Sequence, residues 1–263
     1  VLKKRVTNKI ESTDTLNLQL FLTDNCNMDC IYCFNKSVRE NFYIDNNLYN
    51  KIKDWIIKRV RETSPKNIIV KYYGGEPTVN YNILKKFQKL FYELQKQYSV
   101  TTKFLLDTNG TCLTRSKLEV LYKYGLKSIQ ITVDGTKRVH DNRRIMSNNK
   151  SSFKIIMNKI KMIYSITKTP VIIRVNIDFQ NINNIKELIL YLEKENYKDK
   201  IILAFERVVN PILSSKKIKN YYENIPKKIY DLYRFSIKKS FNTCSGFENI
   251  FPLTGPCAYY SAN

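Results

Sequence analysis

The stretch LFLTDNCNMDCIYCFN, residues 20–35, joins an apolar run to three cysteines, Cys26, Cys30 and Cys33. The run Leu16–Leu22 predicts a buried strand, so the cysteines lie in the loop that leaves it. Their spacing, C-x3-C-x2-C, puts three of the chain's six cysteines within eight residues. Six cysteines in 263 residues do not make a secreted disulfide scaffold, and clustered thiols of a reducing compartment more often bind metal.

Composition narrows the class of protein. Hydrophobic residues are 43% of the chain and charged residues 26%, as in an ordinary globular protein. No apolar run reaches the roughly 18–20 residues of a membrane span, and no signal-peptide core begins the chain, so we expect a cytoplasmic protein without a membrane partner. The net charge of +22 favours nucleic acid, an anionic membrane or an acidic polypeptide as partner, but lysines spread along the predicted helices also fit a Lys-rich composition.

Strand and helix patterns alternate along the chain. Strands are predicted at Leu16–Leu22, Asn67–Tyr72, Thr101–Asp107, Ser128–Val133, Val171–Asp178 and Ile201–Phe205. Helices are predicted at Leu48–Val60, Tyr81–Gln97, Lys117–Tyr124, Phe153–Thr167, Ile185–Glu195 and Ile218–Phe241. Six strand–helix units in succession predict a parallel sheet with right-handed crossovers, an α/β fold of the partial, open (β/α)6 TIM-like barrel type. Sites in such folds lie at the carboxyl ends of the strands.

Three thiolates suit an iron–sulfur cluster with one open iron. A four-iron cubane normally takes four thiolates, so three would leave its fourth iron free for an exogenous ligand. The alternative is a zinc site made by the three cysteines with His140 or another cysteine. A second short pair of zinc ligands is missing from the sequence, which favours the cluster.

Other unusual residues follow the next strands. YYGGEPTVN, residues 72–80, carries two glycines that allow close approach to a ligand and a carboxylate, Glu76, that can accept from an ammonium. LLDTNGT, residues 105–111, ends the third strand, and SIQITVDGTKRVHDNRR, residues 128–144, ends the fourth. IIRVNID, residues 172–178, places Arg174, Asn176 and Asp178 on one face by alternation, either lining a cavity or forming a satisfied buried network.

This combination resembles the radical S-adenosylmethionine (SAM) superfamily, and within it the peptide- and protein-modifying branch with a SPASM or twitch domain, which includes anaerobic sulfatase-maturating enzymes. The cysteine motif and G-G-E-P are specific to the superfamily, and the T-N-G-T, S-x-D-G-like and H-D-x-x-R motifs point to the branch less firmly. The resemblance, which covers about residues 16–263, implies a [4Fe–4S] cluster on Cys26, Cys30 and Cys33. In the family, SAM chelates the open iron and is cleaved to a 5′-deoxyadenosyl radical that takes a hydrogen atom from the substrate.

The resemblance also implies which residues bind SAM. Tyr32 holds the position that contacts adenine, G-G-E-P binds the methionine amino group, and Arg144 of the H-D-x-x-R motif can hold a carboxylate. The candidate cofactor-binding residues are Tyr32, Gly74, Gly75, Glu76, Pro77, Asn109, Thr132, Asp134, Arg144, Arg174 and Asn176. No residue is assigned to catalysis itself, for which His140 and Asp178 are the candidates; a structural role is the alternative for His140.

The carboxyl end departs from the branch. PLTGPCAYYSAN, residues 252–263, looks like the opening of a SPASM segment in which Cys257 is an auxiliary-cluster ligand, but the later cysteines are absent. We therefore expect a truncated chain with a radical SAM core at 1–240 and the start of a SPASM-like segment at 241–263. The resemblance implies one or two auxiliary [4Fe–4S] clusters in the intact protein.

The predicted function is an enzyme that modifies a peptide or protein side chain, for example by forming a thioether or a formylglycine. Its expected partners are a precursor peptide or protein and a flavodoxin- or ferredoxin-type reductant. A radical SAM enzyme acting on RNA or a small molecule is the first alternative, although no RNA-binding module is visible. A noncatalytic module that binds zinc and nucleic acid is the second.

Overall fold

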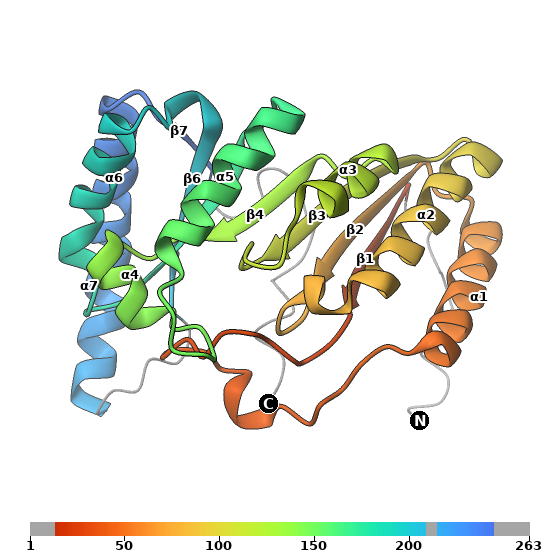
Figure 1. The fold of residues 1–263 in the computed structure, drawn as a ribbon, viewed down its shortest axis with the longest axis horizontal. Coiled ribbons are helices and arrows are strands. Elements are labelled where there is room, and N and C mark those ends of the chain that lie inside the picture. The colour runs from red at the N-terminus through yellow and green to blue at the C-terminus, as the bar shows by residue number, and fades with distance from the viewer. Residues whose placement is uncertain (1–13, 209–214, 245–263) are drawn as a thin grey trace, which may run out of the picture.

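The computed structural model describes residues 14–208 and 215–244, which form a seven-stranded parallel sheet with strands in sequence order (Figure 1). The strands are β1 (Thr15–Phe21), β2 (Asn67–Tyr73), β3 (Thr101–Thr108), β4 (Ser128–Thr132), β5 (Val171–Ile177), β6 (Ile201–Arg207) and β7 (Asn242–Thr243). The α-helices are α1 (Asn46–Thr63), α2 (Tyr81–Tyr98), α3 (Arg115–Lys123), α4 (Lys137–Arg143), α5 (Phe153–Thr167), α6 (Ile185–Lys194) and α7 (Ser215–Lys238). Short 3-10 helices are η2 (Lys36–Val38), η3 (Pro77–Asn80), η4 (Ile182–Asn184) and η5 (Lys198–Lys200).

The strand order confirms the predicted open barrel. Each strand pairs in parallel with the next, from β1 with β2 to β6 with β7, and within the described residues β1 and β7 are the two edges. A parallel pair needs a crossover connection, and a helix supplies it in each unit. The loops that leave the carboxyl ends of the strands therefore gather at one rim of the sheet.

The main core lies between the sheet and its helices. In β1, Leu18 and Leu20 belong to this core while Asn17 and Gln19 are exposed, because successive side chains of a strand point to opposite faces. Phe87 and Phe91 of α2 are fully buried against the same core. In Figure 1, α1 and α2 lie alongside β1 and β2.

The inner face of the sheet carries a second, smaller apolar cluster. Leu105, Ile172 and Ala204 form it, and Cys244 packs against it. Beside it on β3, Asp107 lies 3.9 Å from the Lys71 ammonium and accepts a 3.2 Å hydrogen bond from Gln130. The inner face is therefore mixed in polarity, unlike the apolar outer face.

One α-helix and one strand of the described residues were not predicted from the sequence, and neither were the short 3-10 helices. Helix α4 lies in the predicted loop after the fourth strand, and β7 adds two residues to the edge of β6. The boundary at residue 240 stays a prediction; the described residues beyond it, 241–244, contain β7, and Cys257 lies outside the described residues. No helix in the described part of the chain has the length and apolarity to cross a membrane.

Candidate active site

The three cysteines lie in the loop that leaves the carboxyl end of β1. Cys26, Cys30 and Cys33 are half-buried free thiols. The loop has its own internal bonds, since Cys33 N–H donates to the Cys30 carbonyl at 3.1 Å and Thr23 Oγ1 donates to the Phe42 carbonyl at 2.6 Å. The sequence folds this segment into a compact loop that presents all three thiols.

The glycine pair of G-G-E-P lies directly against this loop. Gly75 N–H donates to the Thr23 carbonyl at 2.7 Å, and Glu76 N–H donates to the Asn25 carbonyl at 2.8 Å. A Cβ at Gly74 would lie 2.4 Å from the Thr23 carbonyl oxygen, and one at Gly75 2.3 Å from that of Asp24. The close approach expected of these glycines is thus an approach to the cysteine loop, and their contact with a cofactor stays a prediction.

Glu76 is fully buried and already has protein donors. One carboxylate oxygen accepts from Thr78 N at 3.0 Å, from the Thr78 hydroxyl, and from the Thr108 hydroxyl at 2.6 Å. The other accepts from Asn109 N at 2.6 Å. Burial raises the pKa of this carboxyl, and the hydrogen bonds from Thr108, Thr78 and Asn109 oppose the rise. Glu76 therefore joins the loop after β2 to the loop after β3.

Asn109, in the T-N-G-T loop, reaches the cysteine loop with its side chain. Its Nδ2 donates to Asn27 Oδ1 at 2.8 Å and to Cys26 Sγ at 3.8 Å. Burial, followed by the nearby Glu76 charge, raises the pKa of the Cys26 thiol to about 12. A bound metal deprotonates a coordinating thiol outright, so this pKa describes the thiol in the metal-free loop.

Tyr32 lies at the centre of a network formed by five of the predicted residues. Its hydroxyl donates to Asp134 Oδ2 and accepts from Arg144 Nη1 at 2.7 Å and from Asn176 Nδ2 at 3.1 Å. Asn176 N donates to the other Asp134 oxygen at 2.9 Å, and Arg174 Nε donates to Asn176 Oδ1 at 2.9 Å. Burial raises the pKa of Asp134, and the charges of Arg144 and Arg143 oppose that rise.

His140 is fully buried, with both ring nitrogens engaged. Nδ1 lies 3.2 Å from the Asp134 N–H and accepts from it, so the proton is on Nε2, which lies 3.1 Å from Ser152 Oγ. The Ser152 hydroxyl in turn donates to the Arg144 carbonyl at 2.7 Å. Burial, followed by the Arg144 charge, lowers the pKa of His140 to about 3. These contacts favour the structural alternative for His140 over a role as general base.

Asp178, the second catalytic candidate, lies just past β5 in a two-pronged ion pair. Both of its oxygens accept from Arg143, each at 2.9 Å, and Oδ1 also accepts from Gln180 N at 2.8 Å. The Arg143 guanidinium lies 5.0 Å from the centre of the Tyr32 ring. Asp178 therefore reaches the network through Arg143.

Arg143 and the segment after it are the features that sequence reasoning missed. Residues 143–147 pair with the cysteine loop in an antiparallel manner, with a bridge between Met28 and Met146. Asp29 N donates to the Ile145 carbonyl at 2.7 Å, and Ile31 N donates to the Arg143 carbonyl at 3.0 Å. Figure 1 shows this contact where the loop after β1 meets the segment between α4 and α5. The doubled arginine in HDNRR was the available signal, but a motif with one arginine drew attention to Arg144 alone.

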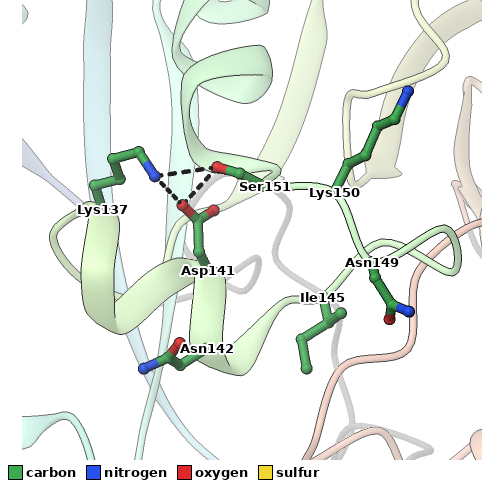
Figure 2. Close-up of a pocket in the computed structure, with 7 residues that line it drawn as sticks. All are labelled: Lys137, Asp141, Asn142, Ile145, Asn149, Lys150 and Ser151. Carbon is green, nitrogen blue, oxygen red and sulfur yellow. Dashed lines mark hydrogen bonds and ion pairs between the residues drawn. The ribbon is translucent and has the colours of Figure 1, made fainter.

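A pocket beside α4 contains none of the predicted site residues (Figure 2). Within it, Lys137 Nζ lies 2.8 Å from Asp141 Oδ2, which also accepts from Ser151 Oγ at 2.6 Å. The remaining Asp141 oxygen accepts from the N–H groups of Ser152 and Phe153, at the start of α5. Asp141 thus caps a helix, and the pocket is lined by residues of α4 and of the segment that follows it.

The donor set fits an iron–sulfur cluster better than a zinc ion. In the described ranges, no three His, Cys, Asp or Glu side chains are close enough together to hold one metal ion. His140 is committed to Asp134 and Ser152, so it does not complete a zinc site with the cysteines. A cluster bonds each thiolate to a different iron. Three separate thiols, one of which accepts from the Asn109 side-chain N–H, suit that arrangement.

Thr132, the remaining predicted residue, lies at the buried end of β4. It pairs in register with Arg174 of β5, which belongs to the Tyr32 network.

Fold and site together define a class: an open α/β barrel with a three-cysteine cluster loop at the carboxyl end of its first strand. A model of the radical SAM superfamily matches residues 20–192, well over half of the chain. The chain belongs to the radical SAM superfamily, whose members use a [4Fe–4S] cluster and SAM.

Individual relatives agree with this placement. The chain is 26% identical over 222 residues to a cysteine-type anaerobic sulfatase-maturating enzyme of Clostridium novyi, covering 80% of this chain and 57% of that protein. It is 29% identical over 251 residues to a GTP 3′,8-cyclase of Clostridium perfringens, covering 93% of this chain and 68% of that one. Thus it spans little more than half the length of the first relative.

A solved structure shows the same fold. The anaerobic sulfatase-maturating enzyme anSMEcpe with bound AdoMet and the Kp18Cys peptide superposes with a TM-score of 0.71 at 21% identity, over 90% of this chain and 67% of that one.

Proposed function

We propose that the protein is a radical SAM enzyme that removes a hydrogen atom from a side chain of a peptide or protein. The observation that carries this proposal is the meeting of four loops at one rim: the loops after β1, β2, β3 and β4 contact one another around the three thiols and Tyr32. The sulfatase-maturating relative and the fold shared with a peptide-bound structure support a peptide as substrate.

Within this proposal, the residues of the rim divide into two groups. Cys26, Cys30 and Cys33 hold the cluster; when bound, it supplies the electron that cleaves SAM to the 5′-deoxyadenosyl radical. Gly74–Pro77 and Asn109 bind the methionine end of SAM, and Tyr32 contacts adenine. The network of Asp134, Arg144, Arg174 and Asn176 holds Tyr32, and together with Thr132 it binds the ribose and carboxylate groups.

Two features of the chain's own residues serve this role. Tyr32 has its hydroxyl fixed by three partners, so its ring orientation is set before any ligand arrives. Arg144 is buried, and its Nε has no hydrogen-bond partner in the described part of the chain, so it offers an anion a donor without first breaking a contact seen there. A flavodoxin- or ferredoxin-type protein is the proposed electron donor, and a precursor peptide or protein is the proposed substrate.

The test begins with the cluster. After anaerobic reconstitution we expect about four irons with matching sulfide per chain and reductive cleavage of SAM to 5′-deoxyadenosine. Single changes of Cys26, Cys30 or Cys33 to Ala should abolish cleavage. Retained cleavage in any of these variants would refute the cluster assignment, and one zinc per chain in place of iron would support the zinc module.

The substrate class requires its own measurement. A peptide that contains a cysteine deuterated at its β-carbon should transfer deuterium to 5′-deoxyadenosine, detected by mass spectrometry. Deuterium transfer from labelled GTP but not from the peptide would instead support a small-molecule enzyme, an alternative that the match to a GTP 3′,8-cyclase favours. Modification of RNA would equally contradict the peptide substrate.

A further inference from the structure

Arg39 lies six residues after Cys33 and belongs to none of the motifs. Its guanidinium contacts the cysteine loop at three points. Nη2 donates to the Met28 carbonyl at 3.2 Å and to Cys33 Sγ at 3.9 Å, and Nη1 lies 3.6 Å from Asp29 Oδ1. The side chain is 17% exposed, so these contacts are largely shielded from water.

These contacts place a positive charge beside a cluster ligand. The Arg39 Nε–H is buried and has no hydrogen-bond partner among the residues that the structure describes, which carries a free-energy cost that a simple surface ion pair would avoid. Asp29, its acidic partner, is the more exposed of the two and also lies 3.8 Å from Lys36. The charge on Arg39 is therefore only partly offset near Cys33.

A second side-chain donor reaches another of the three thiols. Asn109 Nδ2 lies 3.8 Å from Cys26 Sγ, on a loop 70 residues further along the chain. Hydrogen bonds to ligand sulfurs and nearby charge are among the factors that set the reduction potential of an iron–sulfur cluster. Both factors stabilise the reduced form more, because it carries one more negative charge.

We propose that Arg39 is a positioning residue that raises the reduction potential of the cluster held by Cys26, Cys30 and Cys33, with Asn109 as a weaker second donor. This inference rests on the proposed function, because it requires the cluster. Arg39 acts through Cys33 and through the cysteine loop, and it makes the cluster easier for a protein reductant to reduce.

The experiment is a potentiometric titration followed by electron paramagnetic resonance, without SAM, in which dithionite supplies the one electron that reduces the cluster. Arg39→Met removes the positive charge and the hydrogen bonds to the Met28 carbonyl and to Cys33 Sγ. We expect its midpoint to be more negative by the equivalent of about a tenfold change in the oxidised-to-reduced ratio, about 59 mV for a one-electron couple. Arg39→Lys keeps the charge without the forked geometry and should shift the midpoint less, in the same direction.

Lys36→Met is the matched control. Lys36 shares the acidic partner Asp29 but is 57% exposed, and within the described residues its side chain makes no hydrogen bond to a cysteine sulfur. It should shift the midpoint by less than half as much as Arg39→Met. A fully loaded Arg39→Met protein with the wild-type midpoint, or an equal shift in Lys36→Met, would overturn the proposal.

Cluster content separates this test from the test of function. If Arg39→Met binds too little iron to titrate, Arg39→Lys and Asn109→Ala decide: a negative shift in both supports the proposal, and wild-type midpoints in both overturn it. Failure of the wild-type protein to bind about four irons would instead refute the proposed function itself.

Discussion

At the residue scale, the buried Glu76 carboxylate connects two loops of the candidate site. A carboxylate without solvent contact is costly unless it is hydrogen-bonded, and here four protein donors supply those bonds. The donors come from two loops, so the same side chain is both a predicted ligand for the SAM ammonium and a link between β2 and β3. The two roles can be separated by experiment.

Glu76→Gln replaces one carboxylate oxygen with an NH2 group while keeping the shape. Because only one acceptor oxygen remains, at least one donor, such as Asn109 N–H, loses its partner; an unsatisfied buried group costs about 1–3 kcal/mol. We expect the free energy of unfolding of the apoprotein to fall by about that amount, measured by urea denaturation. SAM affinity of the folded, reconstituted variant should fall about tenfold to a hundredfold.

The matched control is Glu119→Gln, which removes a carboxylate from an exposed ion pair with Arg115. It should change the unfolding free energy by less than about 1 kcal/mol and leave SAM affinity unchanged. Loss of stability in Glu76→Gln together with wild-type SAM affinity would mean that Glu76 acts only as a link between loops.

At the scale of elements, the cysteine loop is held from two sides by backbone contacts. The G-G-E-P loop pairs with residues 23–25, and the segment after α4 pairs with residues 27–31. Both pairings are made by backbone N–H and carbonyl groups. The geometry of the thiols is therefore set by neighbouring loops as much as by the cysteine loop itself.

Gly75→Ala tests this support. The added Cβ would lie 2.3 Å from the Asp24 carbonyl oxygen and 2.5 Å from that of Asn25, and because both are backbone atoms, the loops must separate. We expect the iron and sulfide content after reconstitution to fall at least severalfold, with a loss of stability of about 1–3 kcal/mol or more.

Gly125→Ala is the comparison for this change. Gly125 has a positive φ of +93°, so alanine is strained there too, but the nearest atom to its Cβ is 3.4 Å away in a side chain. Gly125→Ala should therefore lose some stability while binding a full cluster. Full cluster content in Gly75→Ala would contradict a supporting role for this loop contact.

The elements also show what a sequence pattern can and cannot predict. The strands that begin at Ser128 and Val171 were predicted within a residue or so, because apolar alternation is a local signal. Helix α4 has the polar sequence KRVHDNR without apolar periodicity, and tertiary contacts of His140 hold it. The pairing of residues 143–147 with the cysteine loop joins segments over a hundred residues apart, which no local pattern encodes.

In the candidate site, too, the sequence predicted some features and not others. Motif residues such as Tyr32, Asp134 and Asn176 were predicted to be functional, and the structure brings them together. What spacing could not supply was which partner each would take. Asp178 pairs with Arg143, and His140 pairs with Ser152. Arg143 and His140 both lie on α4, so these contacts depend on where that helix packs, which a local pattern does not encode.

At the scale of the whole molecule, the net charge of +22 is the feature that the site does not use. Several lysines are paired with acidic residues on the same helix, such as Lys58 with Glu62 and Lys89 with Glu93. Such exposed pairs contribute little to stability, and nearly half of the positive charge has no acidic counterpart in the chain. Under the peptide-modifying proposal, an acidic leader or recognition segment is the partner that this charge would attract.

Salt dependence tests that proposal. Screening acts over about 10 Å at 0.1 M ionic strength, so binding of an acidic peptide to the surface should weaken steeply between low and moderate salt, measured by fluorescence anisotropy. SAM cleavage should change little over the same range, because its proposed binding groups are buried within the rim of the barrel. The matched control is the same peptide with its Asp and Glu changed to Asn and Gln, which should bind weakly at all salt concentrations. Acidic-peptide binding that ignores salt, or RNA that displaces the peptide and is itself modified, would contradict an acidic peptide as the partner.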